Sequence, residues 1–357
     1  ILVDVESDIK KGLPAIQIVG MGTKSVDEAK ERVRSAVTNS LMEFPTKKIT
    51  INLAPAEIVK DGAHFDLPIA LSILVSSGQL RQNDLDGSAF AGELALDGEL
   101  RPIKGAINIA ETARDAGMKR LYLPAPNAEQ ACLIHGIEVI GIKNLKEAFL
   151  HLKSELRIAP TTAPEADVEQ STGIGPHLDD IFGQEQAKRA EAIAVAGRHN
   201  LLLTGPPGAG KTMLAKALAN LIPTLNTEEQ IAVTKLHSIA GEIDGQIINK
   251  RPFRAPHHTT SPIAVIGGGT RPKPGEISLA HLGVLFLDEM PEYPRSVLEA
   301  LRQPLEDKKI AVSRAGGKVT YPADFMLVAT MNPCPCGHLG DPSKECRCSA
   351  TQILAYN

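Results

Sequence analysis

The chain has 357 residues and a formal net charge of −4, because 42 Asp and Glu residues outnumber 38 Lys and Arg residues. Its hydrophobic and charged fractions, 43% and 22%, are ordinary for a globular protein, and its length suits two or three domains. The mild acidity excludes a general attraction to nucleic acid, so any site for a polyanion has to be a local patch.

The chain carries no signal for a membrane or for secretion. No apolar run approaches the ~20 residues of a membrane span. The first residues, ILVDVESDIKKG, lack the basic and then apolar pattern of a signal peptide. They also lack an initiator Met and begin inside a strand-like stretch. We therefore expect a cytoplasmic protein, of which this chain is a trimmed part.

Residues 1–157 mix short apolar strands with amphipathic helices, which indicates an α+β domain. Strands are predicted at residues 15–21, 47–55 and 120–125, and helices at residues 26–41, 65–80 and 105–117. The second of these helices is expected to end near Gly78. Residues 91–103 predict a β-hairpin, because Asp97-Gly98 is a strong turn signal between two apolar stretches.

The composition changes after this domain. Residues 158–178 contain prolines, Ser, Thr and acids without apolar periodicity, which is typical of an extended linker. Strands and helices then alternate through residues 179–357, which predicts a parallel α/β sheet.

The strongest motif is GPPGAGKT at residues 205–212, which matches the phosphate-binding pattern G-x-x-x-x-G-K-[ST] in full. It stands between the strand-like LLLT and the helix-like MLAKALANL, the context that this motif needs. Its backbone N–H groups are expected to wrap the phosphates of a nucleotide. Lys211 would neutralise the β and γ phosphates, and the Thr212 hydroxyl would bind Mg²⁺. The predicted nucleotide-binding residues are Gly205, Pro206, Pro207, Gly208, Ala209, Gly210, Lys211 and Thr212.

Two later strands end in residues that complete this site. The buried stretch VLFL precedes Asp288 and Glu289. Asp288 would hold Mg²⁺ through water, and Glu289 would act as the general base toward the attacking water. The apolar stretch FMLVATM ends at Asn332, which we expect to position that water against the γ-phosphate.

The base of the nucleotide needs a separate set of contacts. Ile181, Phe182 and Gln184, just ahead of the first sheet strand, are expected to pack around adenine. The predicted cofactors are therefore ATP or ADP with Mg²⁺.

Lysines and arginines gather in two loops of this acidic chain. Residues 250–275, KRPFRAPHHTTSPIAVIGGGTRPKPG, hold no acid, and residues 307–325 predict a basic hairpin turned at Gly316-Gly317. Such clusters suit the phosphates of DNA, through contacts that are sequence-independent and salt-sensitive. The alternative is that both loops are merely solvated faces. The candidate DNA contacts are Lys250, Arg251, Arg254, Arg271, Lys273, Lys308, Lys309, Arg314 and Lys318.

Four of the five cysteines fall in CPCGHLGDPSKECRC, residues 334–348. Two Cys-x-Cys pairs in a short loop suit a structural, tetrahedral Zn²⁺, with His338 as an alternative ligand. Free thiols and disulfides are the other possibilities. Cys132 stands apart and is predicted to be a small buried hydrophobe. The candidate zinc ligands, here called the cysteine cluster, are Cys334, Cys336, Cys346 and Cys348.

The order of the phosphate loop, LFLDE and ATMNP resembles the AAA+ ATPases. RAPHHTTS, GGGTRPKPGEISLAHLGVLFLDE and MNPCPCG further resemble the magnesium-chelatase-like proteins of the ComM/YifB family, and the similarity covers essentially the whole chain. This resemblance implies a hexameric, ATP-driven DNA helicase that promotes branch migration in natural transformation and homologous recombination. It also implies that residues 250–275 include an insertion that faces the central pore of the ring.

Residues 1–157 resemble the Lon-protease-like domain of that family, which has a ribosomal S5 domain 2-like fold. KDGAHFDLPIALSIL parallels the segment with the proteases' serine, and residues 92–117 parallel the segment with their lysine. His64 and Ile107 stand at those two positions, and Lys104 is out of register. Because a Ser-Lys dyad needs both groups, the resemblance implies a domain without proteolysis that serves assembly and DNA contact.

The helical lid of the family, with its Leu-Leu-Asp-Arg segment, does not occur before the chain ends at Asn357. An arginine finger can increase the rate of nucleotide hydrolysis by about 10³–10⁵-fold. We therefore expect this chain to bind nucleotide but to hydrolyse it poorly and to assemble weakly. The alternative function is that of a chelatase-like ATPase that remodels a protein partner, while the missing dyad opposes an ATP-dependent protease.

Overall fold

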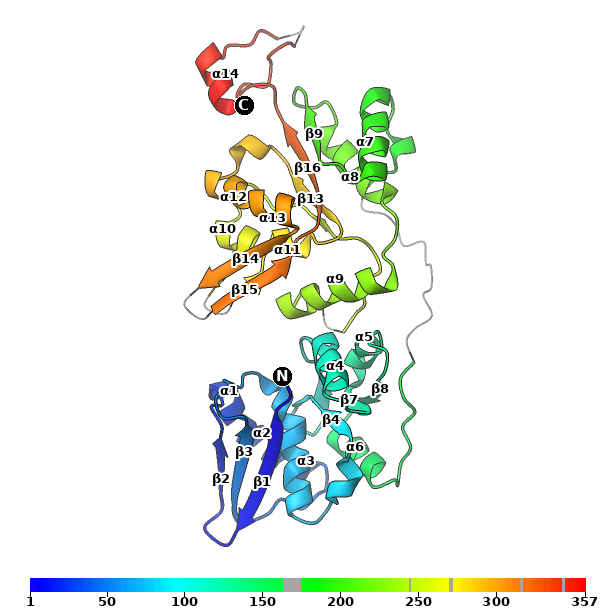
Figure 1. Cartoon of the computed structure of the whole chain (residues 1–357), viewed down its shortest axis with the longest axis vertical. Helices are drawn as coiled ribbons and strands as arrows, with labels where there is room; N and C mark the ends of the chain where they lie inside the picture. Colours follow the sequence, from blue (N-terminus) through cyan, green and yellow to red (C-terminus); the bar gives the residue numbers. More distant parts are fainter. Residues whose placement is uncertain (163–174, 244, 270–271, 315–316, 342–343) are drawn as a thin grey trace. The chain divides into compact units, whose positions relative to one another are not determined.

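The computed structural model describes residues 1–162, 175–243, 245–269, 272–314, 317–341 and 344–357. The chain, which Figure 1 traces from end to end, divides into two compact units. Unit 1 comprises Ile1–Asp167 and Gly241–Ile247, and unit 2 comprises Val168–Ala240 and Ile248–Asn357. Among the described residues, no helix combines the length and the apolar composition that a membrane crossing requires.

The first sheet of unit 1 has the strand order β1-β3-β2, with β1 antiparallel and β2 parallel to β3. Ile49, Ile51 and Leu53 of β3 are buried, because alternate side chains of a strand point to opposite faces. They share one core with the helices α2 and α3. These elements are β1 (Asp4–Lys10), β2 (Ala15–Val19), α1 (Lys24–Asp27), α2 (Ala29–Asn39), β3 (Lys48–Ala54) and α3 (Asp66–Ser76).

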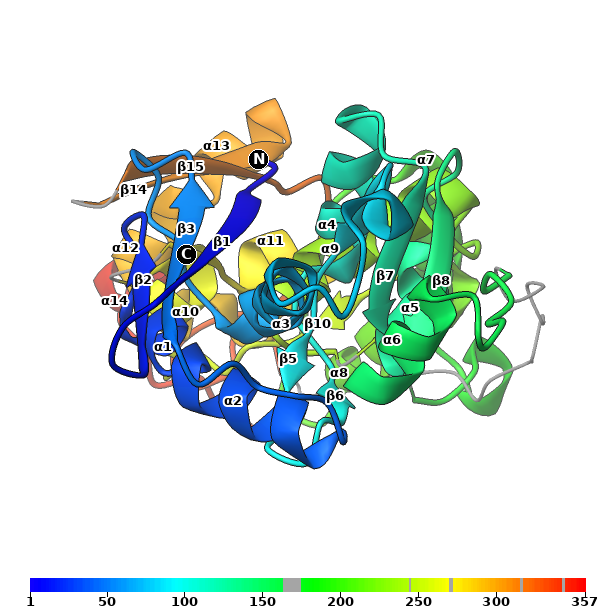
Figure 2. The ribbon, with the colours of Figure 1, turned by 90° about the horizontal axis from the view of Figure 1, so that it is seen from below.

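The second sheet of unit 1 is parallel and has the order β4-β7-β8. Figure 2 shows α3 between this sheet and the first one. Seven of the eleven residues of α3 are buried, which suits a helix packed on several sides. The elements are β4 (Ser88–Phe90), α4 (Ala106–Asp115), β7 (Arg120–Pro124), α5 (Ala125–Ala131), β8 (Glu138–Ile142) and α6 (Leu145–Leu152).

The predicted hairpin is present in unit 1. It consists of β5 (Glu93–Leu94) and β6 (Leu100–Arg101), and Gly98 in its turn has a φ of 92°. Helix α3 ends at Ser76, close to Gly78 as expected. The sequence patterns did not predict β4, β8, α5 or α6, because β4 has only three residues and β8 buries consecutive residues without alternation.

A buried ion pair joins α2 to the start of α3. Arg32 Nε donates to Asp66 Oδ2 at 2.7 Å, and Arg32 Nη2 donates to Asp66 Oδ1 at 3.0 Å. The Asp66 side chain is 0% exposed and also accepts the backbone N–H of Leu94 at 3.2 Å. Burial raises the pKa of Asp66, whereas the contacts with Arg32 lower it. The guanidinium of Arg32 therefore stabilises the ionised form of the buried Asp66 carboxyl group.

The sheet of unit 2 is parallel throughout and has the order β10-β13-β16-β9. Every residue of β13 is buried, as expected for a central parallel strand. This sheet confirms the parallel α/β fold predicted for the second half of the chain. Its strands are β9 (Leu201–Thr204), β10 (Phe253–Arg254), β13 (Val284–Leu287) and β16 (Met326–Met331).

Helices cover both faces of this sheet. Val284 and Phe286 share a core with residues of α7 and α8, whereas Leu285 and Leu287 share a core with residues of α11 and α12. One continuous apolar run in β13 thus supplies both cores. The helices of unit 2 are α7 (Glu185–Gly197), α8 (Lys211–Leu218), α9 (Thr227–Ala240), α10 (Pro262–Ile266), α11 (Glu276–Leu279), α12 (Arg295–Ala300), α13 (Arg302–Asp307) and α14 (Ala350–Tyr356).

Two antiparallel strand pairs complete unit 2. One is β11 (Gly267–Gly268) with β12 (Lys273–Pro274), and the other is the predicted basic hairpin, β14 (Lys309–Arg314) with β15 (Gly317–Pro322). The sequence predicts the turn of this hairpin at Gly316-Gly317. Gly317 instead begins β15 and pairs with Arg314, while Gly316 lies outside the described residues.

Replacing Arg32 by Ala should destabilise unit 1 by about 3–5 kcal/mol near neutral pH, because it leaves the Asp66 carboxylate buried without its counter-charge. A raised carboxyl pKa means that the folded state binds the proton more tightly than the unfolded state, so the stability deficit should shrink as the pH falls toward about 5. Urea unfolding at both pH values measures this.

The double variant Arg32→Ala with Asp66→Asn is the control, since it has no charge to bury. It should be more stable than Arg32→Ala near neutral pH and should lose the pH dependence. An Arg32→Ala deficit that is the same at both pH values would contradict the role of the Asp66 charge.

Candidate nucleotide-binding site

The phosphate loop, residues 205–212, connects the end of β9 to the first turn of α8. Gly208 and Gly210 have φ values of 80° and 83°, in the left-handed region that glycine adopts without strain. No side chain caps the start of α8. Its first N–H groups and the positive end of its dipole are therefore available to an anion.

The side chain of Lys211 folds over this loop. Its Nζ donates to the carbonyl oxygens of Gly205 at 2.7 Å and Pro206 at 3.0 Å, and to Oδ1 of Asn332 at 3.1 Å. Burial lowers the pKa of Lys211, and the nearby carboxylate of Asp288 acts in the opposite direction. The structure thus brings together residues from three motifs that are far apart in the sequence.

Two threonines hold the carboxylate of Asp288. Thr212 Oγ1 donates to Asp288 Oδ2 at 3.0 Å, and Thr330 Oγ1 donates to Asp288 Oδ1. The Thr330 hydroxyl also accepts the backbone N–H of Glu289 at 3.0 Å. Glu289 has a φ of 52°, which is uncommon for a residue with a side chain. The parallel neighbours β13 and β16 therefore fix the backbone on which the predicted general base stands.

Thr330 is a residue of this site that the motifs did not predict. It is fully buried within β16, an otherwise apolar strand. Buried hydroxyl groups almost always have hydrogen-bond partners. A single threonine inside a strand expected to lie beside Asp288 is the signal that could have found it.

The oxygens of Thr212 and Asp288 fit a magnesium ion. Thr212 Oγ1 and Asp288 Oδ2 are 3.0 Å apart, a hydrogen-bond distance, so the hydroxyl and the carboxylate face the same point of the site. A hydroxyl that binds Mg²⁺ directly and a carboxylate that holds it through water need such neighbouring oxygens. Hydroxyl and carboxylate oxygens are also the hard donors that Mg²⁺ takes from proteins.

The predicted adenine contacts occupy different environments. Ile181 is 3% exposed and packs with Leu214 and Ala217 of α8. Phe182 is 95% exposed, and Gln184 Nε2 donates to the carbonyl of Ala209 at 3.4 Å. Ile181 therefore belongs to the core under α8, and Gln184 reaches the phosphate loop. Their assignment to adenine stays a prediction.

Comparison with known protein sequences gives the family. The family model "Magnesium chelatase, subunit ChlI" matches residues 177–357, and the model "Subunit ChlI of Mg-chelatase" matches residues 5–127. The chain is 46% identical to the competence protein ComM of Haemophilus influenzae, over 99% of this chain and 70% of that protein. It belongs to the ComM/YifB family of magnesium-chelatase-like proteins.

Two further relatives agree with this assignment. The uncharacterised protein YifB of Escherichia coli (strain K12) is 46% identical over 99% of this chain and 69% of that protein. The magnesium-chelatase 67 kDa subunit of Chlorobaculum parvum is 28% identical over 43% of this chain and 23% of that protein. The family predicted from the sequence is confirmed.

Two arginines of the basic stretch are tied into unit 2 of this ComM/YifB-family protein. The Nη2 of Arg251 lies 3.0 and 2.8 Å from the two carboxylate oxygens of Glu229, and its Nη1 donates to the carbonyl of Leu282 at 2.8 Å. Arg254 donates to both oxygens of Glu276, at 2.6 and 2.8 Å. Both side chains are predicted DNA contacts, but their donors bind partners inside the unit, so they are not part of the proposed DNA surface.

The other predicted DNA contacts differ in how they are placed. Lys250, Lys273, Lys308 and Lys309 are exposed. Lys308 also forms an ion pair of 3.3 Å with Asp324, and exposed pairs of this kind contribute little stability. The remaining three are Arg271, outside the described residues, and Arg314 and Lys318, which belong to β14 and β15.

The four sulfurs of the cysteine cluster lie within 4.8 Å of one another. The sulfur of Cys334 is 3.4 Å from that of Cys336 and 3.6 Å from that of Cys346, and the latter two are 3.7 Å apart. Four thiolates about 2.3 Å from a tetrahedral Zn²⁺ are about 3.8 Å apart, whereas disulfide sulfurs are about 2.05 Å apart. The cluster therefore has the shape of a zinc site, and the alternative ligand His338 instead contacts Asp341 at 3.3 Å.

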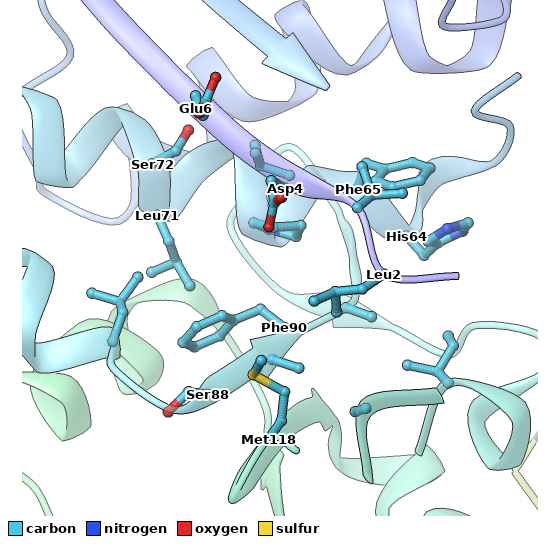
Figure 3. A pocket seen from close by; sticks show the side chains of 18 of the residues that line it. Leu2, Asp4, Glu6, His64, Phe65, Leu71, Ser72, Ser88, Phe90 and Met118 are labelled. Carbon is cyan, nitrogen blue, oxygen red and sulfur yellow. The ribbon is translucent and has the colours of Figure 1, made fainter. Parts of the chain in front are cut away.

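In unit 1, His64, which the resemblance places at the position of the protease nucleophile, borders a cavity of about 740 Å³ between β1, α3, β4 and α4. His64 lines this cavity together with apolar side chains such as Phe65 and Phe90 (Figure 3). Burial lowers the pKa of His64. Ile107 is fully buried in the core, Lys104 is exposed, and no lysine is among the described residues that line the cavity.

Replacing Lys211 by Ala should weaken nucleotide binding by about 10- to 100-fold, because a hydrogen bond to a charged group contributes about 1.5–3 kcal/mol. Titration with a fluorescent ATP analogue measures this. Lys216→Ala is the matched control, since it removes an exposed lysine from the same helix. Equal affinities for the two variants would remove Lys211 from the site.

Proposed function

We propose that this chain binds ATP with Mg²⁺ and supplies the catalytic core of a hexameric ring that hydrolyses ATP and moves DNA. The observation that supports this best is the meeting of Lys211, Thr212 and Asp288 with Asn332 at the carboxyl ends of parallel strands. Ligands of parallel α/β sheets bind at that edge. Lys211 supplies a cation for the phosphates, Thr212 and Asp288 supply oxygens for Mg²⁺, and Asn332 supplies an amide. A site for a nucleoside triphosphate requires these groups.

Each residue has a role that follows from its contacts. Lys211 exchanges its carbonyl partners for the β and γ phosphates, and the N–H groups at the start of α8 bind the same phosphates. Magnesium held at Thr212 and Asp288 would neutralise phosphate charge. Glu289, whose backbone is fixed by Thr330, accepts the proton of the attacking water. Asn332 orients Lys211 and that water.

DNA is the proposed polymer because of the lysines and because of a relative. Lys250, Lys273, Lys308 and Lys309 form the exposed part of the proposed surface, to which Arg271, Arg314 and Lys318 are added from the sequence. The relative in Haemophilus influenzae is named a competence protein. We infer that this chain acts in the same process, natural transformation, as a branch-migration helicase that supports recombination.

Zinc in the cysteine cluster is the second proposed metal. The sulfur spacing supports it, because four sulfurs within 4.8 Å of one another suit a tetrahedral ion. No catalytic role follows, because four protein ligands close a zinc site to substrate. This zinc is structural.

Remodelling of a protein partner is the second candidate function. Its support is the pairing of Arg251 and Arg254 with carboxylates inside unit 2, which leaves fewer cations for DNA. The match to a magnesium-chelatase subunit points the same way. The two functions differ in what stimulates ATP hydrolysis: DNA in the first, a protein in the second.

Binding to a labelled DNA duplex should depend steeply on salt. If four exposed lysines contact phosphates, the logarithm of the association constant should fall with the logarithm of the salt concentration with a slope of about −3.6 or steeper. Lys309→Gln should make this slope shallower by about 0.9. Fluorescence anisotropy at several salt concentrations measures both. Lys216→Gln, away from the two basic loops, should leave the slope unchanged. Salt-independent binding, or none, would favour the protein-remodelling function.

Replacing Glu289 by Gln should keep ATP binding and lower turnover by about 10²–10⁴-fold, because the amide cannot accept the proton of the attacking water. Phosphate release and titration with a fluorescent ATP analogue separate the two effects. A variant that hydrolyses ATP at the unaltered rate would exclude Glu289 as the base.

A further inference from the structure

The cysteine cluster continues directly from the nucleotide site along the chain. β16 ends at Met331, Asn332 follows and contacts Lys211, and Cys334 comes two residues later. Cys334 is fully buried. The chain then returns at Cys346 and Cys348, whose sulfurs lie within 4.8 Å of the other two. The segment that carries Asn332 is therefore closed on itself next to the residue that contacts Lys211.

This segment also packs against the phosphate loop. A Cβ at Gly337 would lie 2.8 Å from both Cγ and Cδ of Pro207, and 4.0 Å from Cγ of Asn332. Gly337 has a φ of 79°, and its N–H donates to the carbonyl of Cys334 at 2.9 Å. Only glycine fits so close an approach in this conformation. The turn inside the cysteine cluster is thus in contact with the loop that would hold phosphate.

The cluster needs a strong force to stay closed. Neutral thiols are weak donors and weak acceptors, so their mutual contacts hold a loop poorly. Thiolates at these distances would repel one another without a cation between them. Metal binding instead adds its free energy directly to the folding of the segment that supplies the ligands. The position of Gly337 and Asn332 would then depend on the metal.

We infer that zinc in the cysteine cluster positions the nucleotide site, so that loss of the metal weakens nucleotide binding. The metal holds Gly337 against Pro207 and keeps Asn332 in contact with Lys211. The cysteines are then positioning residues, since they act on the nucleotide only through these two contacts. The inference rests on the proposed nucleotide site and adds a regulator to it: zinc availability.

The first experiment compares the zinc-loaded chain with Cys346→Ser, a ligand remote in sequence from Asn332. Metal analysis should find about one zinc per unaltered chain and none in the variant. Affinity for a fluorescent ATP analogue should fall roughly tenfold, as expected when a charged hydrogen bond is lost. Cys132→Ser, in unit 1, is the control and should change neither quantity.

Two further measurements keep the test decisive if Cys346→Ser folds poorly. Gly337→Ala retains all four cysteines and should keep its zinc, but its methyl group displaces Pro207 and should weaken nucleotide binding. Trypsin reports on the segment itself, because Lys344 and Arg347 are exposed within it. Removing zinc from the unaltered chain with a zinc-selective chelator should speed cleavage after these two residues, without nucleotide present.

Two results would overturn the inference while leaving the proposed function intact: an unaltered chain that binds nucleotide but holds no zinc, or loss of zinc with unchanged affinity. Failure of the proposed function looks different. The zinc-loaded chain would then be protected from trypsin but would bind nucleotide no better than Lys211→Ala, and the inference would fall with it.

Discussion

The site in unit 2 depends on the parallel pairing of β13 with β16. That pairing places the end of one strand, with Asp288 and Glu289, beside the end of the other, with Thr330 and Asn332. β9 lies on the far side of β16 and delivers the phosphate loop to the same edge. The apolar run of β13 keeps these strands central, because its alternate residues are buried against helices on both faces. A sliding of the strands by one residue would separate every contact described for Asp288.

Motifs with fixed spacing could be predicted from the sequence because their chemistry is local. The phosphate loop needs a strand before it and a helix after it, and one short stretch of sequence contains the patterns of all three. The same holds for the acids that follow β13 and for the turn at Asp97-Gly98. The fold class could be predicted because strand-like and helix-like stretches of sequence alternate. The structure confirms these elements because each depends on neighbours in the sequence.

The arginines show why other features could not be predicted. Residues 250–275 contain no acid, so Arg251 and Arg254 looked unopposed. Their partners, Glu229 and Glu276, each lie 22 positions away in the sequence and reach them only through the packing of α9 and α11. Thr330 escaped notice for the same reason, since its partners stand on another strand. The closeness of Gly337 to Pro207 likewise depends on how two loops meet in space.

The packing around Ile107 in unit 1 bears on whether this unit could hydrolyse peptides. Ile107, which the resemblance to the Lon-type proteases places at the position of their lysine, is fully buried in α4. An ammonium group forced into that interior would lose its hydration without gaining a partner, so it would deprotonate or disrupt the helix around it. A serine in place of His64 would meanwhile have a nucleophile's hydroxyl but no base. The buried position of Ile107 in α4, together with the identity of the two side chains, therefore disfavours a Ser-Lys dyad in unit 1.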